Sequence, residues 1–279
     1  MENKYVELSN GFMLPMLGFG TYKATEDSGE KVIIDALLSG YRYFDTASFY
    51  ENESDIGNAI IKSGISRDNL ILASKIWPTD LGYESALKAF EESINKLNTD
   101  YLDIYLIHWP KLSPDDKEWK IKLSDTWRAM EELYKSGTIK AIGLSNFLPH
   151  HIEVIKQNAT VMPMLNQLEL HVGYMQNVAV EYCRKNNIAV QAWSPLGRGR
   201  VLEDEIVVKM AKKYNKTVGQ FLLGFLIQND IAVIPKASKP DRMKENQNIF
   251  DFKISKEDKY SLLCLPEFGW SGEHPDFRS

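Results

Sequence analysis

The feature that most constrains the fold is a regular alternation of short apolar runs with segments of helical period. The runs are rich in β-branched and aromatic residues, as buried strands are. A helix expected over 86–97 places Leu87, Phe90 and Ile94 on one face, and a second helix is expected over 126–137. Strands that alternate with helices predict a parallel sheet. The eight expected strands are 16–22, 41–47, 70–76, 101–109, 139–146, 164–170, 188–196 and 231–237.

Eight strand–helix units in a chain of 279 residues predict an α/β protein with a closed (β/α)8 barrel, the TIM-barrel fold. Two short alternating runs flank Asn10-Gly11, a dipeptide suited to a hairpin turn, and we expect this hairpin to close the bottom of the barrel. A doubly wound dinucleotide fold is disfavoured, because Gly18 and Gly20 supply only the first two glycines of its fingerprint. No linker-like segment interrupts the alternation, so we expect a single domain over 1–279.

The composition argues against several classes of function. The net charge of -5 and the pI near 5.7 disfavour nucleic acid as a partner, which would need a concentrated basic face. The first residues lack the basic and apolar regions of a signal peptide, and the apolar run 221–227 is too short to span a bilayer. Cys183 and Cys264 form no CxxC motif, which fits a reducing compartment. We expect a cytoplasmic monomer that does not bind membranes.

Polar or aromatic residues stand at the C-terminal ends of the expected strands. In a barrel these ends meet at one mouth, where catalytic residues are found. A lone aspartate or lysine there is usually a solvated rim charge. Burying a neutral polar group costs about 2–7 kcal/mol unless it finds a partner, so we expect these groups to meet one another. They are Asp45, Lys75, His108, Ser145, Asn146, Gln167, Trp193, Ser194 and Lys236.

Three of these residues, with Tyr50 just beyond the first, form a set that can protonate an oxyanion. A neighbouring ammonium favours the phenolate form of a tyrosine, so Lys75 is expected to lower the pKa of Tyr50 from its usual value of about 10. Asp45 would pair with Lys75 and keep it charged. His108 would hydrogen-bond a carbonyl oxygen held between itself and Tyr50.

The segments that carry these residues, DTASFYEN, LASKIW and LIHWP, resemble the aldo-keto reductase family. GFGTY, GLSNF, LNQLE, AWSPLG, IPKAS and DRMKEN extend the resemblance over nearly the whole chain, in the family's order. The resemblance implies that Asp45, Tyr50, Lys75 and His108 are a catalytic tetrad. It also implies an enzyme that reduces aldehydes or ketones to alcohols with hydride from NADPH, similar to bacterial reductases of ketoaldehydes and diketogluconate.

The resemblance implies a binding site for NADPH as well. It matches Ser145, Asn146 and Gln167 to positions that hold the nicotinamide carboxamide, whose donors and acceptors suit hydroxyl and amide groups. Trp193 matches the aromatic residue on which the nicotinamide ring stacks, where tyrosine is more usual. Further cofactor positions implied at this end are Gly20, Thr21, Tyr22, Ser194 and Leu196.

At the other end of the cofactor, Lys236, Ser238 and Arg242 match the group that binds the adenosine 2'-phosphate. Two cations and a hydroxyl near a helix start around Pro240 suit an anion, which favours NADPH over NADH. The positions implied near the adenine are Glu245 and Asn246.

The substrate is expected to be a small carbonyl compound in an aromatic pocket. The loop 197–204 and the tail 266–279 are short, so we expect this pocket to be open and permissive. No HExxH motif or carboxylate spacing indicates a metal site. Four aromatic residues adjoin strand ends and are expected to line the pocket: Tyr22, Phe49, Trp77 and Trp109.

Two other functions stay open from the residues themselves. A lysine at a strand end of a barrel can form a Schiff base, as a lyase or aldolase requires, although pairing with Asp45 would keep Lys75 protonated. A non-catalytic regulatory subunit that binds NADPH is the second alternative. Such a subunit would have no need of Tyr50 and His108.

Overall fold

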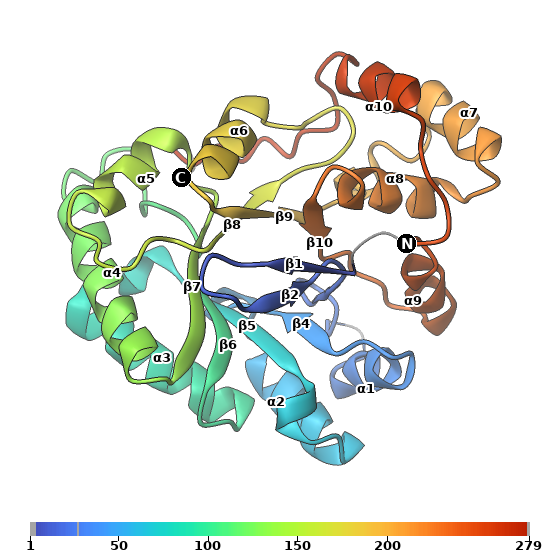
Figure 1. Cartoon of the computed structure of the whole chain (residues 1–279). Helices are drawn as coiled ribbons and strands as arrows, with labels where there is room; N and C mark the ends of the chain where they lie inside the picture. Colours follow the sequence, from blue (N-terminus) through green and yellow to red (C-terminus); the bar gives the residue numbers. More distant parts are fainter. Residues whose placement is uncertain (1–3, 27, 278–279) are drawn as a thin grey trace.

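The computed structural model describes residues 4–26 and 28–277, and within these ranges eight parallel strands form one sheet in chain order from β3 to β10 (Figure 1). The two edges of the sheet are joined, because Leu17 forms a parallel bridge with Val233 and the Gly18 N–H donates to the Val233 carbonyl at 2.9 Å. The predicted closed barrel is therefore confirmed. The strands are β3 (Phe19–Gly20), β4 (Tyr43–Asp45), β5 (Ile71–Ile76), β6 (Leu102–Ile107), β7 (Ile139–Ser145), β8 (Leu165–Glu169), β9 (Ala189–Trp193) and β10 (Ile231–Val233).

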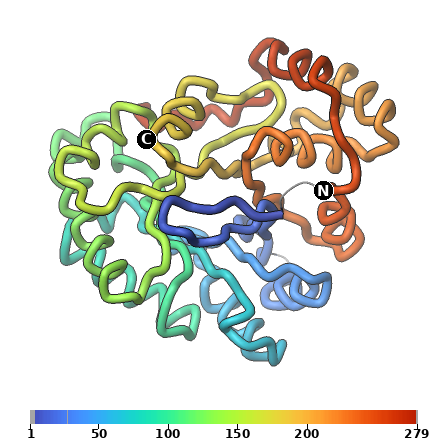
Figure 2. The backbone as a smooth tube through the Cα atoms, in the orientation of Figure 1, coloured from blue at the N-terminus to red at the C-terminus, as the bar shows by residue number. Residues whose placement is uncertain are grey.

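Helices surround the barrel on its outer side (Figure 2). Every residue of β6 is buried, because its two faces pack against the barrel interior and against this layer of helices. The helices are α1 (Glu30–Leu38), α2 (Glu53–Ser63), α3 (Tyr83–Leu97), α4 (Trp119–Lys135), α5 (Pro149–Lys156), α6 (Asn177–Lys185), α7 (Glu205–Lys213), α8 (Val218–Ile227), α9 (Pro240–Gln247) and α10 (Lys256–Leu263), with short 3-10 turns at Ser48–Tyr50, Arg67–Asn69, Pro78–Asp80 and Gly197–Gly199.

The helices expected from the apolar period are present. The segment 86–97 lies within α3, and 126–137 begins inside α4, which stops just before Gly137 at φ 85°. That left-handed backbone angle is one that glycine adopts without strain. Helices α7 and α10 add to the eight-unit pattern, and α7 begins where Asp204 accepts hydrogen bonds from the backbone of Ile206 and Val207, each at 3.0 Å.

The predicted hairpin is also present, formed by β1 (Tyr5–Glu7) and β2 (Met13–Pro15). It lies across the end of the barrel where the strands begin (Figure 1). The Asn10 side-chain amide donates to the carbonyl of Lys140 at the start of β7, at 2.9 Å, and the Leu14 side chain is fully buried. The hairpin therefore closes the bottom of the barrel and leaves the opposite end, where the strands finish, for the site.

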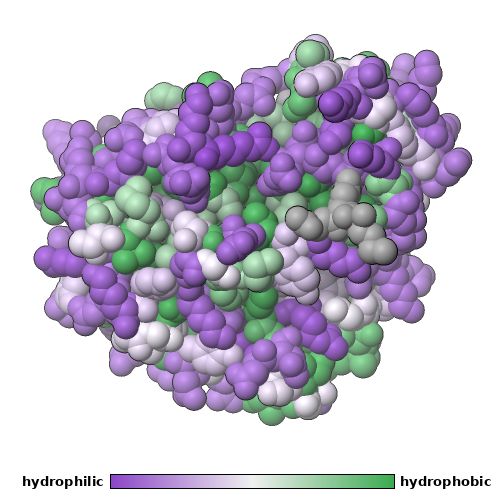
Figure 3. All heavy atoms as spheres, viewed as in Figure 1, coloured by the Kyte–Doolittle hydropathy of each residue, from purple (hydrophilic) through white to green (hydrophobic). Residues whose placement is uncertain are grey.

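One continuous hydrophobic core runs from Leu8 to Leu262 among the described residues, which supports our proposal of a single domain. The face shown in Figure 3 is mainly hydrophilic with apolar residues dispersed over it. No helix in the described part of the chain is long and apolar enough to cross a bilayer.

Candidate active site

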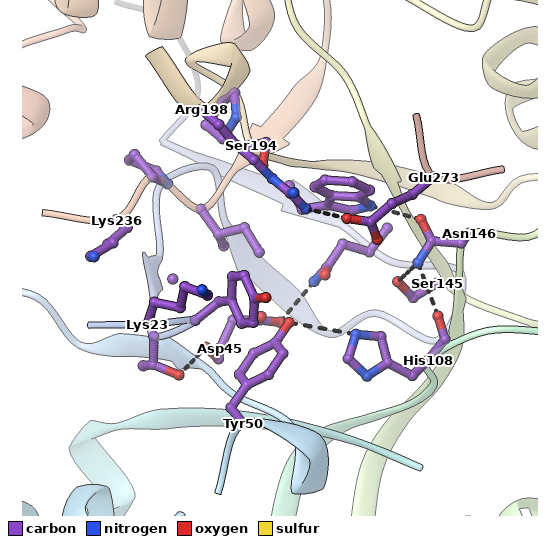
Figure 4. A pocket seen from close by; sticks show the side chains of 18 of the residues that line it. Lys23, Asp45, Tyr50, His108, Ser145, Asn146, Ser194, Arg198, Lys236 and Glu273 are labelled. Atoms are coloured by element: carbon purple, nitrogen blue, oxygen red, sulfur yellow. Dashed lines mark hydrogen bonds and ion pairs between the residues drawn. The ribbon is translucent and has the colours of Figure 1, made fainter. Parts of the chain in front are cut away.

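Four side chains that are far apart in sequence meet at the mouth of the barrel. Lys75 Nζ lies 2.5 Å from Asp45 Oδ1, 2.8 Å from the Thr46 carbonyl and 3.5 Å from the Tyr50 hydroxyl. These three acceptors match the three N–H donors of an ammonium group. The Tyr50 hydroxyl also lies 3.5 Å from His108 Nε2 (Figure 4). The structure thus brings together the four residues of the predicted tetrad.

The tetrad is held by the strands and by one contact between two of the strand-end groups that were expected to meet. Asp45 ends β4 and Lys75 belongs to the neighbouring β5, so their side chains start close together. Asp45 Oδ2 accepts a hydrogen bond from Gln167 Nε2 at 2.7 Å, across the barrel interior from β8. Both oxygens of the Asp45 carboxylate are therefore used, one on Lys75 and the other on Gln167.

The electrostatics at Tyr50 differ from the prediction. Burial raises the pKa of Tyr50 well above its usual value, and the charge of Asp45 raises this pKa further. The pKa of Tyr50 therefore lies above its usual value and not, as was expected, below it. The phenolate loses hydration at this site, and Asp45 offsets the Lys75 charge at a distance of 2.5 Å. Burial also raises the pKa of Asp45 and lowers that of Lys75, while their pairing opposes both shifts.

A cavity of about 500 Å³ opens beside the tetrad. The Phe49 and Trp77 rings stack in its wall with centroids 3.8 Å apart, and the Tyr22 and Tyr50 rings lie 4.9 Å apart. Trp109 also lines the cavity although only 4% of it is exposed. The four aromatic residues expected around the substrate therefore line the same cavity as Asp45, Tyr50 and His108.

The residues matched to the nicotinamide line the same cavity. Asn146 has φ 63°, and its amide nitrogen donates to the His108 carbonyl and to Ser145 Oγ, each at 3.0 Å. Trp193 Nε1 donates to Asn146 Oδ1 at 2.7 Å, which fixes the indole beside this amide. The other expected cofactor positions in the lining are Gly20, Thr21, Tyr22, Gln167, Ser194, Leu196 and Lys236.

A second cavity of about 440 Å³ adjoins the first, because Leu196 and Lys236 line both. Ser238, Arg242 and Asn246 line this second cavity at α9, which begins at Pro240 as expected. The remaining expected position, Glu245, is not in the lining; its Oε2 lies 3.6 Å from Arg242 Nη1 and its Oε1 accepts from Thr217 Oγ1 at 2.5 Å. The lining cations Lys236 and Arg242 are exposed, so they can receive a dianion.

Residues 16–262 match the model of the aldo/keto reductase family. The chain belongs to the aldo/keto reductase family. It is 42% identical over 272 residues to the glyoxal reductase of Bacillus subtilis (strain 168), covering 97% of this chain and 96% of that protein. It is 40% identical over 276 residues to the 9,11-endoperoxide prostaglandin H2 reductase of Trypanosoma cruzi (strain CL Brener), covering 97% and 94%.

Solved structures give the same family. The aldo/keto reductase from Brucella melitensis has a TM-score of 0.87 at 41% identity, with 94% of this chain and 98% of that chain covered. A single-residue variant of Gox0644 in complex with NADPH has a TM-score of 0.91 at 34% identity, with 100% and 99% covered. The predicted family and the barrel fold are thereby confirmed, and this chain is an oxidoreductase of the aldo/keto reductase family.

Three charged residues of this aldo/keto reductase line the cavity without having been predicted: Lys23, Arg198 and Glu273. Glu273 belongs to the tail that we expected to be too short to close the pocket. Its Oε1 lies 2.8 Å from Arg198 Nη2, so the tail and the loop after β9 meet at the cavity wall (Figure 4). Arg198 stands between Gly197 and Gly199, and such a pattern in the sequence indicates an exposed loop. Nothing near Glu273 in the sequence indicated its place.

A histidine cluster lies outside the cavity in this reductase. Atoms of His150, His151 and Asp276 lie within 4.8 Å of one another, as metal ligands would. However, His151 Nδ1 accepts from the Leu148 N–H at 3.1 Å, so neutral His151 carries its proton on Nε2, 3.0 Å from Asp276 Oδ1. Lys111 Nζ is also 3.1 Å from Asp276 Oδ1. The His151 Nε2–H and the Lys111 ammonium thus both contact the Asp276 carboxylate, and these contacts anchor the tail.

Replacing His151 should flatten the acid dependence of stability. Burial lowers the pKa of His151 from 6.5 to about 4. Between these two pH values His151 is protonated in the unfolded chain but neutral in the folded chain. The free energy of unfolding should therefore fall by about 3 kcal/mol as the pH drops from about 6.5 to about 4. In His151→Gln, whose amide can serve both partners, this fall should be missing from urea unfolding curves. His150 is half-exposed, so the His150→Gln variant should keep most of this fall in the free energy of unfolding. An equal fall in the wild type and in both variants would show that His151 is not its cause.

Proposed function

We propose that this enzyme reduces aldehydes and ketones to alcohols with NADPH, and that Tyr50 is the proton donor. The observation that carries the proposal is the position of the Tyr50 hydroxyl, 3.5 Å from both Lys75 Nζ and His108 Nε2 at the wall of an aromatic cavity. Catalytic hydrogen bonds are often this long before a substrate is bound. The relatives named a glyoxal reductase and a prostaglandin H2 reductase support carbonyl or related reductive chemistry.

The tetrad can perform the protonation with each residue in a separate role. NADPH, when bound, supplies the hydride that the carbonyl carbon gains. Tyr50 and His108 hold the carbonyl oxygen, and the Tyr50 hydroxyl gives its proton to that oxygen. A raised pKa keeps Tyr50 protonated until then, and an alkoxide is a far stronger base than a phenolate, so the transfer still runs downhill. Lys75 then stabilises the phenolate, and Asp45 holds Lys75 in place.

The two adjoining cavities support the proposed binding of NADPH. Ser145, Asn146 and Gln167 offer hydroxyl and amide groups beside the tetrad, as a carboxamide requires. The exposed cations at the start of α9 suit a phosphate. A relative that was crystallised with NADPH is similar over the whole chain, which agrees with this placement.

Loss of the nicotinamide absorbance band tests the activity. Wild-type protein should oxidise NADPH in the presence of simple aldehydes, ketoaldehydes or dicarbonyl compounds. Protein that binds NADPH but reduces no member of a broad carbonyl panel would contradict the proposal. Borohydride trapping of a substrate on Lys75 would favour a Schiff-base enzyme instead, but Lys75 is fully buried and does not line the cavity.

Arg242→Ala should selectively weaken the use of NADPH. A charged hydrogen bond to phosphate contributes about 1.5–3 kcal/mol, so KM for NADPH should rise about tenfold or more while KM for NADH changes little. Lys244→Ala is the matched control, because Lys244 is exposed on the same helix and does not line the cavity. Equal losses with both cofactors would show that Arg242 does not read the 2'-phosphate.

A further inference from the structure

An arginine and a glutamate from two separate segments meet in the wall of the reaction cavity. Arg198 belongs to the turn after β9, and Glu273 belongs to the C-terminal tail. Both line the cavity, and Arg198 Nη2 lies 2.8 Å from Glu273 Oε1. In the view of Figure 4 this pair lies above Tyr50 and His108. A positive and a negative group are thus added to a lining that is otherwise rich in aromatic rings.

The Arg198 side chain is held in this position by its neighbours. Its guanidinium carbon lies 5.3 Å from the centroid of the Trp193 ring, and its Nε lies 3.4 Å from Ser194 Oγ. Its backbone has φ 52°, a left-handed angle that arginine seldom adopts, between Gly197 and Gly199. The loop therefore presents the guanidinium to the cavity as a fixed feature of the fold.

The Glu273 carboxylate is the more easily replaced partner. The side chains of Arg198 and Glu273 are 37% and 35% exposed, and ion pairs with this much exposure contribute little to stability. The Glu273 N–H donates to Ser271 Oγ at 3.2 Å, and Ser271 Oγ in turn donates to Glu169 Oε2 at 2.6 Å. These contacts hold the tail backbone, so the Glu273 side chain can leave Arg198 without the tail unfolding.

The charged pair also acts on the proposed reaction centre. The charge of Glu273 raises the pKa of Tyr50 and that of Arg198 lowers it, so both lie within electrostatic range of the proton donor. Tyr50, His108 and Arg198 line one cavity, so a molecule whose carbonyl oxygen sits between Tyr50 and His108 can extend through it toward Arg198. Glu273 already shows that a carboxylate fits against this guanidinium.

We propose that Arg198 binds the carboxylate of oxo-acid substrates in place of Glu273, so that the enzyme favours aldehydes and ketones that carry a carboxylate several bonds from the carbonyl. The inference rests on the proposed reductase function. A guanidinium presents paired N–H donors that match the two oxygens of a carboxylate. The diphosphate of NADPH is the other anion that could use the same donors, and the experiment separates the two.

The test compares each acid with its neutral methyl ester, namely 4-formylbenzoate and methyl 4-formylbenzoate, then 4-oxobutanoate and methyl 4-oxobutanoate. The measured quantity is the acid-to-ester ratio of kcat/KM. Arg198→Met should lower this ratio about tenfold or more, as expected for loss of a charged hydrogen bond. Glu273→Gln should raise the ratio about three- to tenfold, because it removes a competing and repelling carboxylate. When Glu273→Gln is added to Arg198→Met, the acid-to-ester ratio should not change further, because no guanidinium remains for Glu273 to block.

Two controls decide between the explanations. Lys209→Met removes one exposed positive charge outside the cavity, and its ratio should equal that of the wild type. The Kd for NADPH is measured by quenching of tryptophan fluorescence. If Arg198→Met raises this Kd and slows acid and ester equally, Arg198 serves the cofactor and the inference is wrong. If acid and ester are both reduced but neither variant changes the ratio, the inference fails while the reductase function stands. The same holds if wild-type protein reduces other carbonyl compounds of the panel but none of these acids and esters. If wild-type protein reduces no carbonyl compound at all, both proposals fall.

Discussion

Tyr50→Phe should lower kcat for carbonyl reduction by about 100- to 10,000-fold, the usual contribution of a positioned general acid. The phenyl ring keeps the packing against Tyr22 and His108, so the variant should fold normally. Its Kd for NADPH should stay within about twofold of the wild-type value, because only the hydroxyl is lost. Stopped-flow or steady-state loss of the nicotinamide absorbance measures the rate, and fluorescence quenching measures the cofactor affinity.

Phe49→Leu is a suitable control for this variant. Phe49 also lines the cavity and carries an aromatic ring, but 47% of it is exposed and it has no group that can donate a proton. Its replacement should change KM more than kcat. A Tyr50→Phe enzyme that turned over at the wild-type rate would remove the proton-donor assignment, whatever the effect at Phe49.

Lys75→Met should be the most destabilising substitution in the site. It would leave the Asp45 carboxylate, which is 1% exposed, buried without its cation. Removing one partner of a buried ion pair costs about 3–5 kcal/mol, and this loss should appear in urea unfolding. Activity should also fall by at least about 100-fold, because the phenolate left by Tyr50 would lose the ammonium beside it.

The double variant Asp45→Asn with Lys75→Met separates stability from catalysis. With both charges removed, no unpaired carboxylate remains, and the asparagine oxygen can still accept from Gln167. We therefore expect the double variant to recover at least half of the lost free energy of unfolding without recovering activity. A Lys75→Met protein as stable as the wild type would show that the pair is not buried as described.

The positions of Asp45, Lys75 and His108 could be predicted because strand ends in a parallel barrel share one mouth. The period of the apolar runs gives the strands, and the strands place these three residues. Gln167 was expected to meet other strand-end groups, but its partner was not specified, because its bond to Asp45 joins residues 122 positions apart across the barrel interior. The raised pKa of Tyr50 depends on the depth of burial, which no local pattern encodes.

The tail shows the same limit of local reasoning. Its course is set by distant contacts, among them Ser271 with Glu169 and Asp276 with His151, which are separated by 102 and 125 positions. Short length alone suggested that the tail leaves the pocket open. The structure brings Glu273 to the cavity wall, and these two anchors direct the tail there.

The order of the strands around the barrel divides the proposed tasks between two halves of the molecule. Asp45, Tyr50, Lys75 and His108 all lie on or directly after β4 to β6. The groups assigned to the cofactor lie mainly from β7 onward, up to Arg242 on α9. A duplicated gene could therefore acquire a new cofactor preference through changes in its later half alone, and inherit proton transfer intact from the earlier one.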